Sequence, residues 1–234
     1  MNGIRQIILR KRLSDNFARG ALREYRPGEE ARAIDWRASA SRGSIQLRGD
    51  EVQATLTWGA IIDRSRSMQA GRRRSLRDAA NEAAAFWRGC KTPADRWVDV
   101  DPEGSFDFTR ALARALHIMP VPGTLLAAGD FFELPQTPYR LLRAAACRFD
   151  CTALFARDPW RNNLELCGFV TMADLETRAR RRFFIGSRER SNFARAAQAR
   201  EDAAIAVFRA AGWRVTAFDE SGGMQAVMRA FCRL

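Results

Sequence analysis

The sequence predicts an α/β protein with three layers, in which a mostly parallel sheet is covered by helices on both faces. Two observations predict this fold. After about residue 53, short and mostly apolar runs alternate with segments of helical periodicity. Continuous apolar runs suit strands that are covered on both faces, as the strands of parallel sheets are. Right-handed crossovers would place the helices on the two faces of the sheet.

The first strand and the first helix of this fold are predicted at 55–62 and 75–89. The stretch TLTWGAII is apolar and has the length of a strand. In SLRDAANEAAAFWRG the apolar residues recur at steps of three and four, which indicates a helix with one buried face. Ser75 can cap the start of this helix, and Gly89 can end it.

The same reasoning predicts the remaining elements along the chain. Between residues 89 and 105 the sequence has room for only one short strand. The other predicted elements are a helix over 108–119, a strand at 124–128, a helix near 137–147, a strand at 151–156, a helix over 192–212, a strand at 213–219 and a last short helix from residue 224.

Composition excludes several classes of protein. With 234 residues, of which 47% are hydrophobic, the chain can fill a substantial core. No apolar run approaches the roughly 20 residues that span a bilayer, so we expect no membrane segment. The net charge of +12 is spread along the chain without interleaved aromatic residues, so we do not expect nucleic-acid binding. Five cysteines without a CxxC pair are typical of reduced thiols, which predicts a cytoplasmic location.

Two of the predicted strands end in an aspartate. Asp63 is followed by Ser65 and Ser67, and Asp130 follows the strand at 124–128. Ligands of parallel α/β sheets bind at the carboxyl ends of the strands, so both aspartates can converge there. Carboxylates and hydroxyls are oxygen ligands of the kind that Mg²⁺ binds. The pattern also suits a polar turn, in which these side chains bond nearby backbone amides.

A phosphotransferase of the haloacid dehalogenase type is an enzymatic alternative. In such enzymes a strand-ending aspartate attacks phosphorus, and GDFFE at 129–133 resembles their later metal-binding Gly-Asp pair. This chemistry needs a general acid two residues after the nucleophile. Ser65 occupies that position here, which argues against the alternative.

The segment before the first strand carries a long and specific motif. The motif residues are Tyr25, Arg26, Pro27, Gly28, Glu29 and Glu30, followed by Ile34, Asp35, Trp36 and Arg37. A structural role of the segment would use its turn and anchor Trp36 on the sheet, whereas a partner-binding role would use its charged side chains. With IIDRSRSM at 61–68 the segment closely resembles the domain-of-unknown-function 58 family, and the resemblance runs from about residue 17 to the carboxyl end.

The resemblance implies a Rossmann-like von Willebrand factor A domain with a metal-ion-dependent adhesion site. It implies an N-terminal extension over residues 1–52, packed on a core of residues 53–234. The first loop of the site would be Asp63, Ser65 and Ser67, and the third loop would supply Asp130. The second loop departs from the family pattern, because Phe106 occupies the threonine position. Ser105 or Thr109 would have to substitute for that threonine.

The resemblance also implies a function. The protein would be a non-enzymatic interaction module that holds Mg²⁺, or Mn²⁺ or Ca²⁺ in its place, and completes the coordination with a partner's carboxylate. The implied partner is a MoxR-type AAA+ ATPase, and the pair would act like a chaperone in maturing or assembling other proteins. A degenerate, metal-free scaffold of the same family is the alternative that Phe106 suggests.

Overall fold

The protein divides into two compact units, Met1–Thr55 and Leu56–Leu234. The packing of the N-terminal extension on the core stays a prediction. The structure, a computed structural model, describes residues 2–12, 22–26, 34–48, 55–100, 107–131, 139–158, 166–173 and 179–232.

The second unit is built on a five-stranded sheet in which every pair of neighbours is parallel. The strand order is β4-β3-β5-β6-β9, so the chain reverses its direction across the sheet between β3 and β5. This order confirms the predicted parallel α/β sheet. The strands are β3 (Thr57–Ile62), β4 (Arg96–Asp99), β5 (Gly123–Gly129), β6 (Phe149–Ala156) and β9 (Arg214–Phe218).

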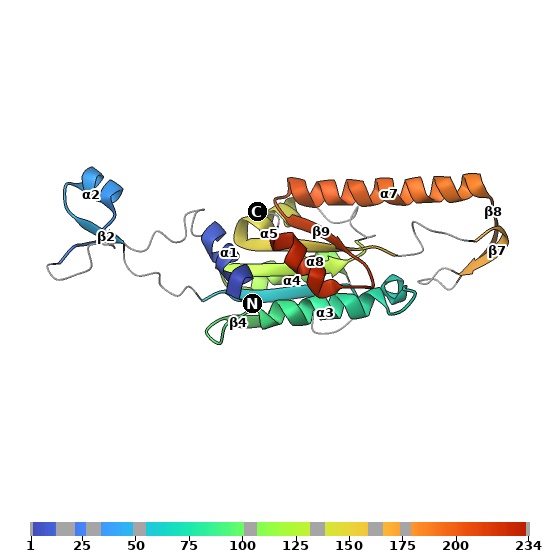
Figure 1. The fold of residues 1–234 in the computed structure, drawn as a ribbon, viewed down its shortest axis with the longest axis horizontal. Coiled ribbons are helices and arrows are strands. Elements are labelled where there is room, and N and C mark those ends of the chain that lie inside the picture. Colours follow the sequence, from blue (N-terminus) through green and yellow to red (C-terminus); the bar gives the residue numbers. More distant parts are fainter. Residues whose placement is uncertain are drawn as a thin grey trace. The chain divides into compact units, whose positions relative to one another are not determined.

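Helices cover both faces of this sheet, which confirms the three layers (Figure 1). On one face α3 and α8 pack so closely that a Cβ on Gly223 would lie 1.8 Å from the carbonyl oxygen of Ala79. The other face carries the remaining helices. The helices are α3 (Leu76–Gly89) and α8 (Gly223–Phe231) on the first face, and α4 (Phe108–Ile118), α5 (Tyr139–Arg148) and α7 (Ser187–Ala210) on the second.

Aromatic side chains fill the core on each face. Phe208 of α7 is fully buried and contacts the rings of Phe131 and Phe155, with ring centroids 4.9 and 5.3 Å apart. On the other face Trp58 of β3 packs edge-on against Trp87 of α3, with centroids 4.8 Å apart. These contacts explain why the alternating apolar runs of the sequence fold into layers, since each face of the sheet buries its own set of rings.

Most predicted elements are confirmed with small shifts of their ends. Ser75 caps α3, because its side chain accepts a hydrogen bond from the backbone N–H of Asp78. The strand β4 is as short as the sequence predicted. The helix predicted from residue 192 begins earlier, at Ser187, where Glu189 bonds back to the N–H of Gly186.

The sequence reasoning missed a two-stranded hairpin before α7. Strand β7 (Gly168–Ala173) pairs antiparallel with β8 (Arg180–Ile185), and the hairpin lies at the far end of the long helix from the sheet (Figure 1). Phe169 and Phe184 face each other across it and are 71% and 60% exposed. Because it has almost no buried face, the hairpin lacks the alternation of apolar and polar residues by which strands are predicted.

The first unit contains a short helix and a second small hairpin-like pairing. Strand β1 (Leu22–Glu24) pairs antiparallel with β2 (Gln46–Arg48). Between them lies α2 (Trp36–Arg42), and the unit begins with α1 (Asn2–Arg12). None of these elements was predicted from the sequence.

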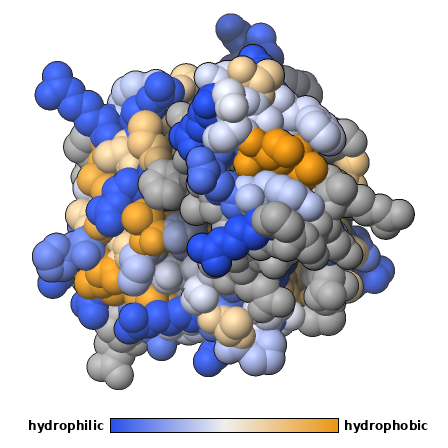
Figure 2. Space-filling model, turned by 90° about the vertical axis from the view of Figure 1, so that its left-hand side faces the viewer, coloured by the Kyte–Doolittle hydropathy of each residue, from blue (hydrophilic) through white to orange (hydrophobic). Residues whose placement is uncertain are grey.

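Apolar and polar side chains alternate on the surface of the protein (Figure 2). On the face that Figure 2 shows, small hydrophobic patches are separated by hydrophilic side chains. Within the described ranges, every helix is too short or too polar to cross a membrane. All five cysteines lie in described segments, and each is free in this structure.

Candidate functional site

Asp63 and Asp130 are placed at the same edge of the sheet by two neighbouring strands. Asp63 directly follows β3 and Asp130 directly follows β5, and the two strands pair in parallel up to Ile62 and Ala128. The backbone N–H of Asp63 donates to the carbonyl of Ala128 at 2.8 Å, which extends the ladder to the site itself. The site therefore lies where the chain reverses its direction across the sheet, the usual ligand position in this architecture.

A chain of hydrogen bonds joins the four residues predicted from the sequence. The Oδ1 atom of Asp63 accepts from the backbone N–H of Ser65 at 2.8 Å. The hydroxyls of Ser65 and Ser67 lie 2.8 Å apart, and Ser67 donates to Oδ2 of Asp130 at 2.6 Å. Residues that are 67 positions apart in the sequence are thus connected through two serines.

Gly129 makes this geometry possible, and sequence reasoning missed it. A Cβ atom at this position would lie 2.7 Å from Cβ and 2.9 Å from Oδ2 of Asp63. The Asp63 side chain is only 2% exposed because it packs directly on the glycine backbone. The sequence shows a glycine immediately before Asp130. However, only the pairing of β3 with β5 reveals that this glycine lies against Asp63.

Phe131 turns the chain just after Asp130 and was also missed. It is a non-glycine residue with φ 54°, in the left-handed region that bulky residues rarely adopt. Its ring is buried and packs edge-on against Phe108, with centroids 5.1 Å apart. Burial of the ring in the aromatic core opposes the backbone strain, so the core fixes the direction in which the chain leaves Asp130.

Two side chains hold the loop that carries the serines in place: the buried Met68 and the arginine Arg77. A short 3₁₀ helix, η3 (Arg66–Gln69), buries Met68 completely. From α3, Arg77 donates to the backbone carbonyls of Arg64 and Ser65, the latter at 2.9 Å. Arg77 neutralises neither carboxylate in these bonds, so it positions the loop without occupying the acidic oxygens.

The oxygen atoms of the site fit a hard cation. Two carboxylates and two hydroxyls lie together, and among the described residues no hydrogen bond is made to Oδ2 of Asp63. The part of the chain that the structure describes contains no cluster of three or more His, Cys, Asp or Glu side chains suited to a metal. A cation here would therefore depend on serine hydroxyls and water as well as the two aspartates.

The second loop of the predicted site is only partly described. Ser105 and Phe106 lie outside the described residues. Thr109 occupies the first turn of α4 with a half-buried side chain, and its role as a ligand stays a prediction. The helix itself is capped by Asp107, whose side chain accepts from the N–H of Arg110.

In the N-terminal motif, Asp35 has a structural role. Its Oδ1 atom accepts from the N–H of Ala38 at 3.0 Å and caps α2. Its backbone N–H donates to the carbonyl of Gln46, and Ser39 bonds both Asp35 and Gln46. These bonds tie the helix to β2.

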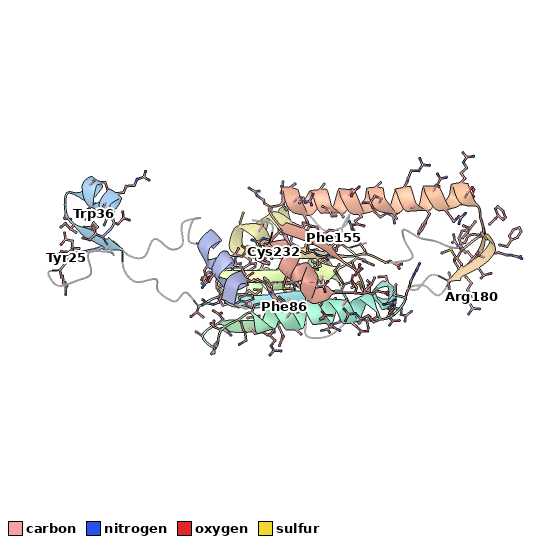
Figure 3. The ribbon with its side chains drawn as sticks, viewed as in Figure 1. Tyr25, Trp36, Phe86, Phe155, Arg180 and Cys232 are labelled. Atoms are coloured by element: carbon pink, nitrogen blue, oxygen red, sulfur yellow. The ribbon has the colours of Figure 1, made fainter. Side chains whose placement is uncertain are left out.

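Other residues of the motif are exposed within this unit. Trp36 is 69% exposed and lies in the first turn of α2, next to the exposed Arg37 (Figure 3). Arg26 is also exposed, while Tyr25 is half-buried and donates its backbone N–H to Ile45. The predicted residues Gly28, Glu29 and Glu30 lie outside the described residues.

The fold and the site define an α/β protein with an acidic, hydroxyl-rich site at the carboxyl edge of a parallel sheet. Residues 21–89 match the family described as protein of unknown function DUF58, which confirms the resemblance seen in the sequence. This range contains the N-terminal motif, β3, the serine loop and α3.

Relatives are found in mycobacteria. An uncharacterized protein of Mycobacterium bovis and another of Mycobacterium tuberculosis are each 27% identical to this chain. Each match covers 77% of this chain and 67% of the relative. No solved structure matches the chain.

Proposed function

We propose that this protein is a non-enzymatic interaction module of the von Willebrand factor A type, with a metal-ion-dependent adhesion site. The observation that carries the proposal is the hydrogen-bonded chain Asp63, Ser65, Ser67 and Asp130 at the switch point of the sheet. The first three residues form a DxSxS loop, and the fourth comes from the next strand of the sheet. Family resemblance supports the same assignment.

Asp63, Ser65, Ser67 and Asp130 would hold the cation, proposed to be Mg²⁺ with Mn²⁺ or Ca²⁺ as alternatives. When bound, the cation would supply an open coordination position for a carboxylate of the partner. The protein's own groups prepare this surface. Gly129 lets the side chain of Asp63 pack directly against the backbone of β5, while Arg77 and Met68 hold the serine loop in place.

The proposed partner is a MoxR-type AAA+ ATPase, as the family resemblance implies, and the proposed location is the cytoplasm. The pair would act like a chaperone on client proteins. Trp36 and Arg37 are adjacent, exposed residues of the N-terminal motif, and residues of these two types often dominate binding energies at interfaces. They are therefore proposed as a further contact with the partner.

A metal-free scaffold of the same fold is the second candidate. It is favoured by the 2.6 Å bond from Ser67 to Asp130, because this bond satisfies the aspartate without a cation. In contrast, no observation favours the phosphotransferase. A nucleophilic aspartate needs an exposed oxygen aimed at substrate, whereas Asp63 is almost completely buried and bonds its own loop.

Affinity capture combined with direct metal binding tests the proposal. Wild type, Asp63→Ala and Ser67→Ala would be used to capture proteins from lysate, each with Mg²⁺ and with chelator, and the ATPase would be identified by mass spectrometry. Calorimetry would measure Mn²⁺ binding to the same proteins. Asp202→Ala is the matched control, because it removes an exposed carboxylate on α7 far along the chain from the site.

We expect the ATPase to be recovered by the wild type and Asp202→Ala only when metal is present. Asp63→Ala should lower the affinity for Mn²⁺ by more than about 10-fold. Equal recovery of the ATPase in every condition would replace the adhesion site with the metal-free scaffold. Absence of the ATPase from all captures, with intact Mn²⁺ binding, would overturn the proposed partner.

A further inference from the structure

Strand β9 forms one edge of the five-stranded sheet, because no other described strand pairs with its outer side. On its inner side it pairs with β6, and the carbonyl of Phe218 accepts from the N–H of Arg157 at 2.8 Å. Backbone groups alternate in direction along a strand. Arg214, Thr216 and Phe218 therefore turn their backbone groups inward, and Val215 and Ala217 turn theirs outward.

The outward groups of β9 are exposed to a groove. Among the described residues, no chain segment pairs with the outer side of β9. The groove has a volume of about 550 Å³ and is lined by all five residues of the strand. Ile205 and Arg209 of α7 form one wall, and Arg229 and Ala230 of α8 form the other. An extended peptide would thus find free backbone donors between two helical walls.

The charge of the groove is positive. Four arginines line it, and two of them are already neutralised: Arg157 by Glu201 at 2.8 Å and Arg214 by the buried Asp150 at 2.6 Å. The surplus charge comes from Arg209, which is exposed, and from Arg229.

One arginine already forms a hydrogen bond with the outer side of β9. Arg229 donates to the outward carbonyl of Ala217 at 3.1 Å, so a guanidinium already reaches the free side of β9. Among the described residues that line the groove, Asp219 is the only carboxylate. Hydrogen bonds from Ser221, with a smaller contribution from the charge of Arg229, hold the pKa of Asp219 below its usual range. Asp219 therefore offsets part of the charge of Arg209 and Arg229, and the groove keeps a positive surplus.

We propose that the outer edge of β9 binds an extended, acidic peptide segment of a partner protein by strand addition. The outward N–H groups of Val215 and Ala217 would bond the peptide backbone, and Arg209 and Arg229 would bind its carboxylates. A second copy of this chain is disfavoured as the occupant, because edge-to-edge pairing would bring the same arginines together. The proposal does not depend on the metal site, so it can fail or succeed independently of the proposed function.

The test uses a fluorescein-labelled peptide that alternates Glu and Val over seven residues. Fluorescence anisotropy would measure its binding to the full chain in the presence of chelator. A second peptide carries an N-methyl group on every backbone amide, which removes the donors on both sides of the extended peptide and keeps every carboxylate. Hydrogen exchange would report whether the amides of Val215 and Ala217 become protected.

The matched variants are Arg209→Glu and Arg188→Glu. Both reverse one exposed charge on α7, but only Arg209 lines the groove. We expect Arg209→Glu and the N-methylated peptide each to weaken binding by about tenfold, and Arg188→Glu to leave it unchanged. Protection of the Val215 and Ala217 amides should accompany binding.

Two outcomes would overturn the proposal. Equal affinity for the N-methylated peptide would mean that the arginines bind carboxylates without strand addition. Absence of binding to the wild type at millimolar peptide would mean that the arginines only guard an exposed edge against unwanted pairing.

Discussion

Strands β5 and β8 have similar lengths and opposite environments. All seven residues of β5 are buried, whereas five of the six residues of β8 are exposed. In β5 every side chain is part of the core, and the strand places Asp130 at a fixed point of the sheet. In β8 the aromatic residues are held mainly by cross-strand contacts such as that of Phe184 with Phe169. The buried strand therefore holds the site residue that follows it in a fixed position. The exposed strand has no such packing to hold its side chains.

The largest effect is expected for a core residue on the helix that joins the two regions. Phe208→Ala on α7 removes a fully buried ring from the aromatic cluster and should lower the free energy of unfolding by about 3–5 kcal/mol. Urea unfolding measures the change. Phe193→Ala, on the exposed part of the same helix, is the control and should change it by about 0.5 kcal/mol or less. Similar losses for both variants would contradict the division of α7 into a buried and an exposed part.

An intermediate effect is expected at the glycine beside the site. Gly129→Ala places a Cβ against Asp63 and should lower the free energy of unfolding by about 1–3 kcal/mol, because the strand and the buried aspartate must move apart. Gly168→Ala in the hairpin meets no atom within 4 Å, but its φ of 82° should cost about 1–2 kcal/mol. Chemical denaturation of the two variants compares steric and conformational strain. A Gly129→Ala protein as stable as wild type would mean that Asp63 is not held by close packing.

The smallest effect is expected in the hairpin. Phe184→Ser removes one ring of an exposed pair, so the free energy of unfolding should fall by less than about 1 kcal/mol. Limited proteolysis between β7 and β8 should nevertheless become faster, because the pair Phe169–Phe184 is the main aromatic contact across the hairpin. Unchanged proteolysis would show that the pair contributes nothing to hairpin stability.

Much of the second unit could be predicted because its strands are buried. The runs that became β3, β5 and β6 are mostly apolar, and their helices carry clear periodicity and capping residues such as Ser75. The hairpin could not be predicted in this way, because most of its residues are exposed to solvent and contact only the neighbouring strand. The run of arginines that begins β8 is not a pattern by which strands are predicted. Arg180, the first residue of β8, lies far from the core of the second unit (Figure 3).

The candidate site was predicted in its polar residues and missed in its supporting ones. Asp63 and Asp130 follow apolar runs, so the rule for parallel sheets was enough to bring them together. Gly129, Phe131 and Arg77 act through contacts with residues that are distant in the sequence, and no local pattern marks them. In the first unit, Asp35 could have been found as a helix cap, because an aspartate before a short helical stretch is a recognised start signal.

By itself the sequence determined the parallel α/β architecture, the two strand-ending aspartates with their serines, and the N-terminal motif, which lies within the residues 21–89 that match the family. These follow from local properties, because hydrophobic periodicity and residue chemistry act over a few neighbouring positions. Only the tertiary structure decided which glycine supports Asp63, which ring turns the chain after Asp130, and which edge of the sheet stays open beside Arg209 and Arg229. The physical reason is that packing and strand order join residues far apart in the chain, and no short stretch of sequence encodes those contacts.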